Sequence, residues 1–226
     1  MPEPGAVDPS LEWQMGSEPE APLGDLTITG RWRFYNRSDI LDSEQFLVEI
    51  VRGDNSAHLA WCYTDVSGYY TCGPFANPGS AGVRSRFISY TSFNPYSDVL
   101  ITVNPDWGTS NNVDNAYGTT TSVQTFSDGT HDIGSWNVNN GANYERAYWI
   151  VKDLILGWKY VFFGTGSSQS PVETTGPSTV QWKIDSTDGT YYSRGGNIHL
   201  TGADPLSNTV VNHEYGHNMM CFSFFW

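Results

Sequence analysis

Hydrophobic and polar residues alternate along the chain from residue 25 onward. In LTITGRWRFYN, Leu26, Ile28, Trp32 and Phe34 are separated by polar or small residues, a period of two that is typical of strands with one buried face. Four more such segments follow between turn residues: QFLVEIVRG, AHLAWCYTD, GYYTCGPF and GVRSRFISYTS. Short strands at this spacing predict an antiparallel β-sandwich over residues 25–103.

Two segments lack this alternation. Residues 1–24 carry five acidic groups, no Lys or Arg, and five of the twelve prolines, which predicts a tail or linker. Residues 104–142 are rich in Asn, Asp, Gly, Ser and Thr, which predicts a polar loop region, with GTTTSVQTF as a strand inside it. Clustered Asp and Asn oxygens leave calcium binding open, but the spacing of an EF-hand is absent and we favour a surface loop.

The pattern changes to helical spacing after residue 142. In NYERAYWIVKDLILGWKYVFF, apolar residues recur every three or four positions, at 147, 150, 151, 154, 155, 158, 161 and 162. STVQWKID and GNIHLTG are predicted as strands, and ADPLSNTVVNHEYGHNMM as a second helix. We expect Asp204 to be the N-cap of that helix and Pro205 its first residue. The predicted fold class is therefore α+β, with a sandwich followed by a smaller unit at 143–226.

Composition and charge narrow the classes of function. Aromatic residues make up 15% of the chain, so it can bury enough surface to fold. The net charge of −13 argues against nucleic acid as a partner, because an acidic surface repels phosphate, and it fits solubility in an extracellular medium. The longest apolar region is interrupted by Lys152, Asp153 and Lys159 and is too short to cross a membrane. The N-terminus shows no signal-peptide pattern, which leaves open a leader that was removed or lies upstream.

Two of the three cysteines are placed to pair. Cys62 and Cys72 flank the turn at 65–68, which puts them on neighbouring antiparallel strands. We predict a disulfide between them, which implies an oxidising compartment and a secreted or extracellular protein; two buried free thiols are the alternative. Cys221 is left unpaired.

The segment VVNHEYGHNMM carries the candidate chemistry. His213 and His217 are four residues apart, so a helix brings both imidazoles to one face, where they can bind one zinc ion. Glu214 lies beside the first histidine and can act as general base, accepting a proton from water on the zinc. The flanking residues are uncharged, as a buried active-site helix requires. A pair of surface histidines that bind nothing is the alternative.

These segments resemble known families. GGNIHLTGADPLSNTVVNHEYGHNMM is similar to the strand, loop and active-site helix of zincin metallopeptidases, and NYERAYWIVKDLILGWKYVF resembles their backing helix. The block at 25–103 resembles the carboxypeptidase-regulatory-like, or transthyretin-like, β-sandwich, chiefly in LTITGRWRFYN, FLVEIV and YTDVSGYYTCGPF.

The zincin resemblance implies a partial zincin-like domain at 143–226, with a backing helix, a short sheet and an active-site helix. It also implies that His213 and His217 are zinc ligands, that Glu214 is the general base, and that NIHLTG is the sheet edge along which substrate peptide lies.

A third zinc ligand is missing from the pattern. The metzincin motif would need a glycine and then a histidine where this chain has Met220 and Ser223, and no later helix follows to supply a glutamate. Cys221 and His199 are the remaining candidates, although we expect His199 to be an exposed strand residue. We therefore expect an incomplete site, weakly active or inactive, in a chain that is truncated or a fragment.

Two function hypotheses remain. The first is zinc-dependent hydrolysis of peptide bonds, with a polypeptide as substrate. The second is a non-enzymatic secreted β-sandwich module that presents Trp61, Tyr63, Tyr69 and Trp107 to a polysaccharide or protein. For these aromatics, packing within the sandwich is the simpler expectation. The sequence predicts no oligomeric state.

Overall fold

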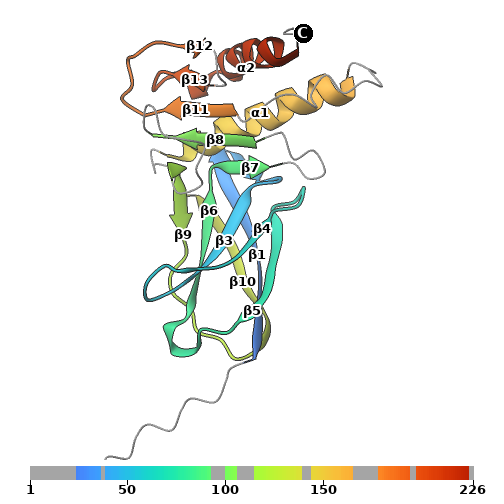
Figure 1. Cartoon of the computed structure of the whole chain (residues 1–226), viewed down its shortest axis with the longest axis vertical. Helices are drawn as coiled ribbons and strands as arrows, with labels where there is room; N and C mark the ends of the chain where they lie inside the picture. Colours follow the sequence, from blue (N-terminus) through green and yellow to red (C-terminus); the bar gives the residue numbers. More distant parts are fainter. Residues whose placement is uncertain are drawn as a thin grey trace, which may run out of the picture.

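A computed structural model describes residues 24–36, 39–92, 100–105, 115–138, 144–164, 178–193 and 197–223. The predicted tail at 1–24, apart from Gly24, and the candidate aromatic Trp107 lie outside the described residues. Two packed sheets form the long body of the molecule, and a third sheet with both helices lies at one end of it (Figure 1).

The first sheet is built around one long strand, β1 (Asp25–Asn36). On one side β10 (Gly129–Val138) runs parallel to it. On the other side β5 (Tyr69–Ala76) pairs antiparallel with the first half of β1, and β2 (Asp39–Asp42) pairs antiparallel with its second half.

The second sheet is antiparallel throughout and has the order β4–β3–β6–β9. Its strands are β3 (Leu47–Arg52), β4 (His58–Tyr63), β6 (Val83–Ile88) and β9 (Gly118–Thr120), and a short 3-10 turn, η1 (Gly79–Ala81), precedes β6. The inner faces of the two sheets meet in one core, where the Trp32 ring stacks on Phe87 with centroids 5.2 Å apart.

The third sheet has the order β12–β13–β11–β8–β7. Its strands are β7 (Tyr90–Ser92), β8 (Leu100–Asn104), β11 (Ser178–Trp182), β12 (Tyr191–Ser193) and β13 (Asn197–Leu200). The three central strands are parallel to one another, and the two outer strands pair antiparallel with them. The helical elements are α1 (Glu145–Gly164), η3 (Asp204–Leu206) and α2 (Asn208–Ser223).

Helix α1 joins the third sheet to the body of the molecule. It packs against β1, β8, η3 and α2, and its periodic apolar positions 147, 150, 151, 154, 155 and 158 are buried as predicted. Tyr148 enters the aromatic core, where its ring lies parallel to that of Phe87, with centroids 4.7 Å apart and 7° between the planes. The same ring contacts Phe34 and Phe46, and its hydroxyl donates a hydrogen bond of 2.9 Å to the carbonyl oxygen of Phe87. No helix in the described part of the chain is long and apolar enough to cross a membrane.

The predicted fold class, α+β with an antiparallel sandwich followed by a partial zincin-like domain, is wrong. The described residues are mostly β, in three sheets with two short helices, and the helices do not show a zincin's backing-helix and active-site-helix arrangement. The body is not purely antiparallel, because β10 joins β1 in parallel, and α1 shares the core of that body through Tyr148. Alternating hydrophobicity predicts strands but does not select their partners, which is why the sheets were assigned wrongly.

The predicted disulfide between Cys62 and Cys72 is confirmed, with 5.2 Å between the two Cα atoms, and Cys221 is free. The bond does not join paired neighbours, however. Cys62 lies on β4 of the second sheet and Cys72 on β5 of the first, so the disulfide ties the two sheets together at their edges.

We expect Tyr148→Ala to lower the free energy of unfolding by about 3–5 kcal/mol, because it leaves a cavity among three aromatic rings. Tyr148→Phe keeps the ring and should cost only about 0.5–1.5 kcal/mol for the lost hydrogen bond. Urea unfolding followed by far-UV circular dichroism measures both. Equal losses in the two variants would contradict a packing role for the ring.

Removing the disulfide should destabilise the fold by about 3 kcal/mol, because a short closed loop no longer restricts the unfolded chain. The test is the double variant Cys62→Ala/Cys72→Ala, compared with wild type in urea with and without reductant. Reductant should lower the stability of wild type and leave the double variant unchanged, and Cys221→Ala is the matched control. A double variant as stable as oxidised wild type would overturn the prediction.

Candidate functional site

Helix α2 carries the candidate metal ligands and is fixed on its inner side. Val211, Tyr215 and Asn218 follow the helical repeat and are buried, and α2 packs against β12, β13 and α1. Asn218 donates a hydrogen bond to the Ser178 hydroxyl of β11. Burial also raises the pKa of the Tyr215 hydroxyl, so this group stays neutral inside the interface.

The start of α2 differs from the prediction. Asp204 is not the N-cap of α2, because it opens the short turn η3 and α2 begins only at Asn208. The Asp204 carboxylate instead accepts hydrogen bonds from the Thr201 backbone N–H, at 2.6 Å, and from the Thr190 hydroxyl. These bonds fix the connection between β13 and the helix.

The two histidines lie together on the outer face of α2. His213 and His217 are both exposed, their Nε2 atoms are 3.1 Å apart, and their rings are perpendicular with centroids 4.7 Å apart. Two nitrogen ligands at about 2.0–2.1 Å from a tetrahedral zinc ion lie about 3.3–3.4 Å from each other. The observed separation is close to that distance, so the pair fits a single zinc ion with little movement.

Glu214 lies at the border between the two faces of α2. It follows His213 directly, about 100° further round the helix, and only 8% of its surface is exposed. Its neighbours in the helical repeat, Val211 and Asn218, are buried against the sheet. The carboxylate is therefore shielded from bulk water but lies next to the face that carries the histidines.

No third ligand accompanies the pair within the described residues, where no group of three His, Cys, Asp or Glu side chains could hold a metal ion. Cys221 and His199, the two candidates from the sequence, are therefore not assembled with His213 and His217. Among the predicted site residues in the described part of the chain, the structure places His213, His217 and Glu214 together on one helix.

The prediction that His199 is an exposed strand residue is wrong. Only 5% of its surface is exposed. Its ring stacks on Tyr191, with centroids 4.3 Å apart, and its Nε2 lies 3.3 Å from the Ser193 hydroxyl. Desolvation lowers the pKa of this histidine, against a weaker opposing effect of Asp188. His199 is therefore a packed, neutral residue of the third sheet.

The predicted sheet edge is also wrong. Strand β13, which contains NIHL, pairs with β11 on one side and with β12 on the other, so it lies inside the sheet. Among the described strands, β12 is the one at that edge. The prediction failed because SRGGNIHL contains no signal for a preceding short strand, and Tyr191–Ser193 has only three residues.

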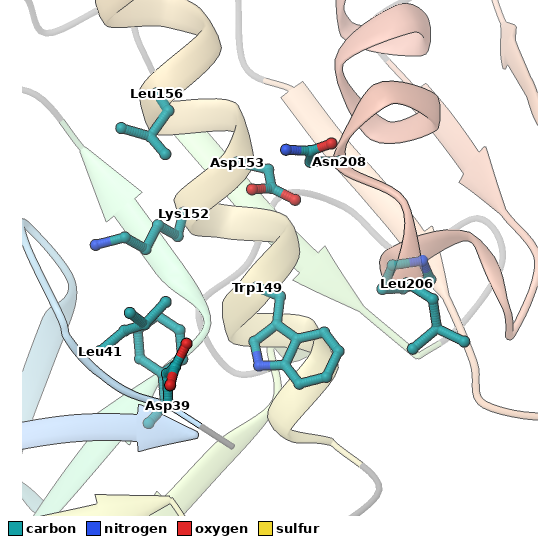
Figure 2. A pocket seen from close by; sticks show the side chains of 10 residues that line it. Asp39, Leu41, Trp149, Lys152, Asp153, Leu156, Leu206 and Asn208 are labelled. Carbon is teal, nitrogen blue, oxygen red and sulfur yellow. The ribbon is translucent and has the colours of Figure 1, made fainter. Parts of the chain in front are cut away.

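A cavity of about 560 Å³ lies beside the N-terminal end of α2, between β2 and α1 (Figure 2). Its walls come from β1, β2, α1, η3 and the first residue of α2: Phe34, Asp39, Leu41, Trp149, Lys152, Asp153, Leu156, Pro205, Leu206 and Asn208. A second hollow of about 490 Å³ shares three of these residues and continues between α1 and α2 as far as Met219.

Asp153 is the notable charge in this cavity. Burial raises the pKa of its carboxyl group to about 6, and the nearby Lys152 opposes that rise only in part. In the described part of the chain, no basic side chain lies within ion-pair distance of it. In the sequence, Asp153 is only an interruption of an apolar run; a charged residue within that run is the one signal that it offers.

Comparison with known proteins gives one family match. Residues 165–224 match the family described as the mycolysin C-terminal domain. The match covers about a quarter of the chain and includes His213, Glu214 and His217. No curated protein matches the chain.

Among solved structures, the chain is similar to a 9R-lipoxygenase from Cyanothece PCC8801, at 12% sequence identity and a TM-score of 0.31. The similar region covers 58% of this chain and 22% of the lipoxygenase chain. A likeness this weak supports no conclusion about fold or function.

We expect Asp153→Asn to stabilise the fold near pH 7.5 by about 1–3 kcal/mol, because it removes a desolvated charge. The native pKa of about 6 lies above the ordinary value of 3.8, so the protonated carboxyl favours the folded state. That contribution is complete below about pH 4 and is lost as the pH rises through 6, so the advantage of the variant should vanish on acidification.

Urea unfolding near pH 4 and near pH 7.5 measures this difference. Asp25→Asn, which changes an exposed carboxylate on β1, is the control and should follow wild type at both pH values. A stability difference between Asp153→Asn and wild type that does not depend on pH would contradict a raised pKa.

Proposed function

We propose that α2 carries the metal site of a secreted zinc-dependent peptidase, in which His213 and His217 hold the zinc ion and Glu214 is the general base. The observation that supports this most strongly is the 3.1 Å between the two Nε2 atoms, which suits one zinc ion. A bound zinc ion would supply Lewis acidity, which polarises a peptide carbonyl and makes water more acidic.

Glu214 is suited to moving protons at this site. Its carboxylate is shielded from bulk water yet borders the histidine face, so it can take a proton from an attacking water and later deliver it to the leaving amine. The inner face of α2, held by Tyr215 and Asn218, keeps the carboxylate in a fixed place relative to the histidines.

A polypeptide substrate would lie along β12. This strand ends the third sheet among the described strands, and α2 packs directly against it. An extended peptide can add to such an edge through backbone hydrogen bonds, which places its carbonyl groups beside the helix. The peptide-binding edge is therefore β12 and not β13.

The comparison supports the proposal without demonstrating activity. The mycolysin family is zinc-dependent and its domains come from secreted proteases, and the matched segment contains all three proposed residues. The disulfide fits an oxidising compartment, which agrees with secretion.

The second hypothesis, a non-enzymatic module that binds polysaccharide or protein, has one observation in its favour. Trp61 is 58% exposed on β4, with its ring against that of His58. Tyr63 shares the outer face of that strand, but Tyr69 lies on β5 in the other sheet, where it contacts Arg31. The aromatics therefore do not form one platform, and we favour the peptidase.

Untagged wild-type protein should bind zinc weakly, because only two ligands are assembled among the described residues. His213→Ala and His217→Ala should each abolish the binding. Isothermal titration with zinc measures this, and His131→Ala, which removes a histidine from β10, is the matched control. Equal zinc affinity in wild type and His217→Ala would reject the site.

Glu214→Gln should abolish any chelator-sensitive peptide cleavage and leave zinc binding unchanged, because the residue moves protons and is not a ligand. We expect the activity of the 226-residue chain itself to be low, since two ligands fix the ion poorly. A quenched fluorescent peptide, with and without chelator, is the assay. Cleavage by Glu214→Gln at the wild-type rate would exclude Glu214 as the general base.

A further inference from the structure

The cavity between β2 and α1 combines apolar walls with unpaired negative charge. Its volume of about 560 Å³ lies within the range of small-molecule sites, about 300–1,000 Å³. The apolar part of its lining consists of Phe34, Leu41, Trp149, Leu156, Pro205 and Leu206. Asp39 and Asp153 supply carboxylates, and neither has an ion-pair partner among the described residues.

Other acidic groups nearby are already neutralised. Asp42 is paired with Arg31, and Glu44 is paired with Lys159. Lys152 also lines the cavity, but its ammonium group donates a hydrogen bond of 3.1 Å to the backbone carbonyl oxygen of Asp42. Figure 2 shows that this ammonium group points away from Asp153. With two carboxylates and one ammonium group, the lining of the cavity has a net negative charge.

Trp149 offers the cavity an aromatic surface. Its indole N–H is already used, because it donates to the backbone carbonyl oxygen of Tyr35. What remains for a ligand is the ring itself, which lies between Asp39 and Leu206 in Figure 2. Aromatic rings attract cations through their negative faces, and a nearby carboxylate adds to that attraction.

We propose that this cavity binds an ammonium or guanidinium group carried on an apolar stem, such as the side chain of a lysine or arginine residue in a peptide. Asp153 binds the charged head, Asp39 adds negative charge on the other side of the cavity, and Trp149 and Leu206 contact the stem. The site is separate from His213 and His217, and it does not depend on the peptidase proposal.

The alternatives are weaker on physical grounds. In Figure 2 the Asp153 carboxylate lies beside Asn208, at the first turn of α2. An anion bound at that turn would therefore be repelled by Asp153. A neutral apolar ligand would exclude water from that carboxylate and give it no partner, which is unfavourable. A cationic head removes the cost of the unpaired charge, so it alone matches the whole lining.

The surroundings leave room for more than one side chain. The second hollow shares Asp153, Leu156 and Asn208 with the cavity and continues between the two helices past Tyr160 to Met219. Gly157 allows the helices to come close there, since a Cβ atom at that position would lie 2.5 Å from the Asn212 Oδ1 atom. The main chain of a bound peptide can therefore follow the helices.

Binding should depend on pH through Asp153. The other charged groups in the lining of the cavity are Lys152 on the same helix and Asp39 on β2, while η3 and the start of α2 contribute no charged group to the lining. With a pKa of about 6 in the empty cavity, Asp153 is ionised near pH 7.5 and protonated near pH 5. A cation favours the ionised form, so acidification should weaken its binding.

The experiment is an NMR titration of the full chain with three capped amino acids at millimolar concentration. N-acetyl-lysine methylamide and N-acetyl-arginine methylamide should bind, and N-acetyl-norleucine methylamide, which lacks the charge, should bind roughly tenfold more weakly. Asp153→Asn should weaken lysine-probe binding roughly tenfold and remove its pH dependence, and Asp39→Asn should weaken it severalfold.

Asp188→Asn, with an exposed carboxylate outside the cavity, is the matched control and should bind as wild type does. Asp153→Asn is isosteric with wild type and is expected to be more stable near neutral pH, so lost binding would not reflect unfolding. Leu206→Trp, which fills the cavity and keeps both carboxylates, should also abolish binding. Equal binding of the norleucine and lysine probes, undiminished binding to Asp153→Asn, or no saturable binding of either cationic probe would overturn the proposal.

Discussion

The insertion of Tyr148 into the aromatic core is the contact on which the rest of the structure depends. Its ring packs against Phe34 of the first sheet and Phe87 of the second, and its hydroxyl is bonded to the backbone of β6. Because Tyr148 belongs to α1, this contact sets the position of the helix relative to both sheets. Helix α1 in turn supports β8 and α2, so the candidate metal site takes its position from an aromatic cluster in the body of the molecule.

Part of this could be read from the sequence. Many of the strands, the two helices and the disulfide follow from local patterns: alternation, helical spacing and two cysteines around a turn. The sheets do not, because partners are chosen by contacts between distant segments. In sequence, β7 and β8 look like a continuation of the sandwich, yet β8 pairs with β11 and β7 pairs with β8 in another sheet. Strand β10 lies in a stretch that is rich in polar residues and was predicted as a loop. It is largely exposed, so it lacks the apolar run that would have indicated a strand.

The same limit applies to the sites. His213, Glu214 and His217 were found because their relation is local, within one helical turn, and the structure keeps them together. His199 was misplaced because its burial depends on β12, which the sequence does not signal. The sequence does not reveal the raised pKa of Asp153, because its burial depends on several separate elements that meet around it. A motif within a helix can thus be predicted, whereas a cavity between elements needs the tertiary structure.

The pairing of β1 with β10 has a consequence for how the chain is made. The two strands are about 100 residues apart in sequence, as the contact from Thr29 to His131 illustrates. On a ribosome, the first strand emerges long before its parallel partner exists, and one of its edges stays unpaired until residue 138 has been synthesised. Contacts of such long range slow folding, so the body of this protein is completed late in translation. An apolar strand left open for that time is a template for aggregation, so the risk of misassembly during synthesis falls on residues 25–36.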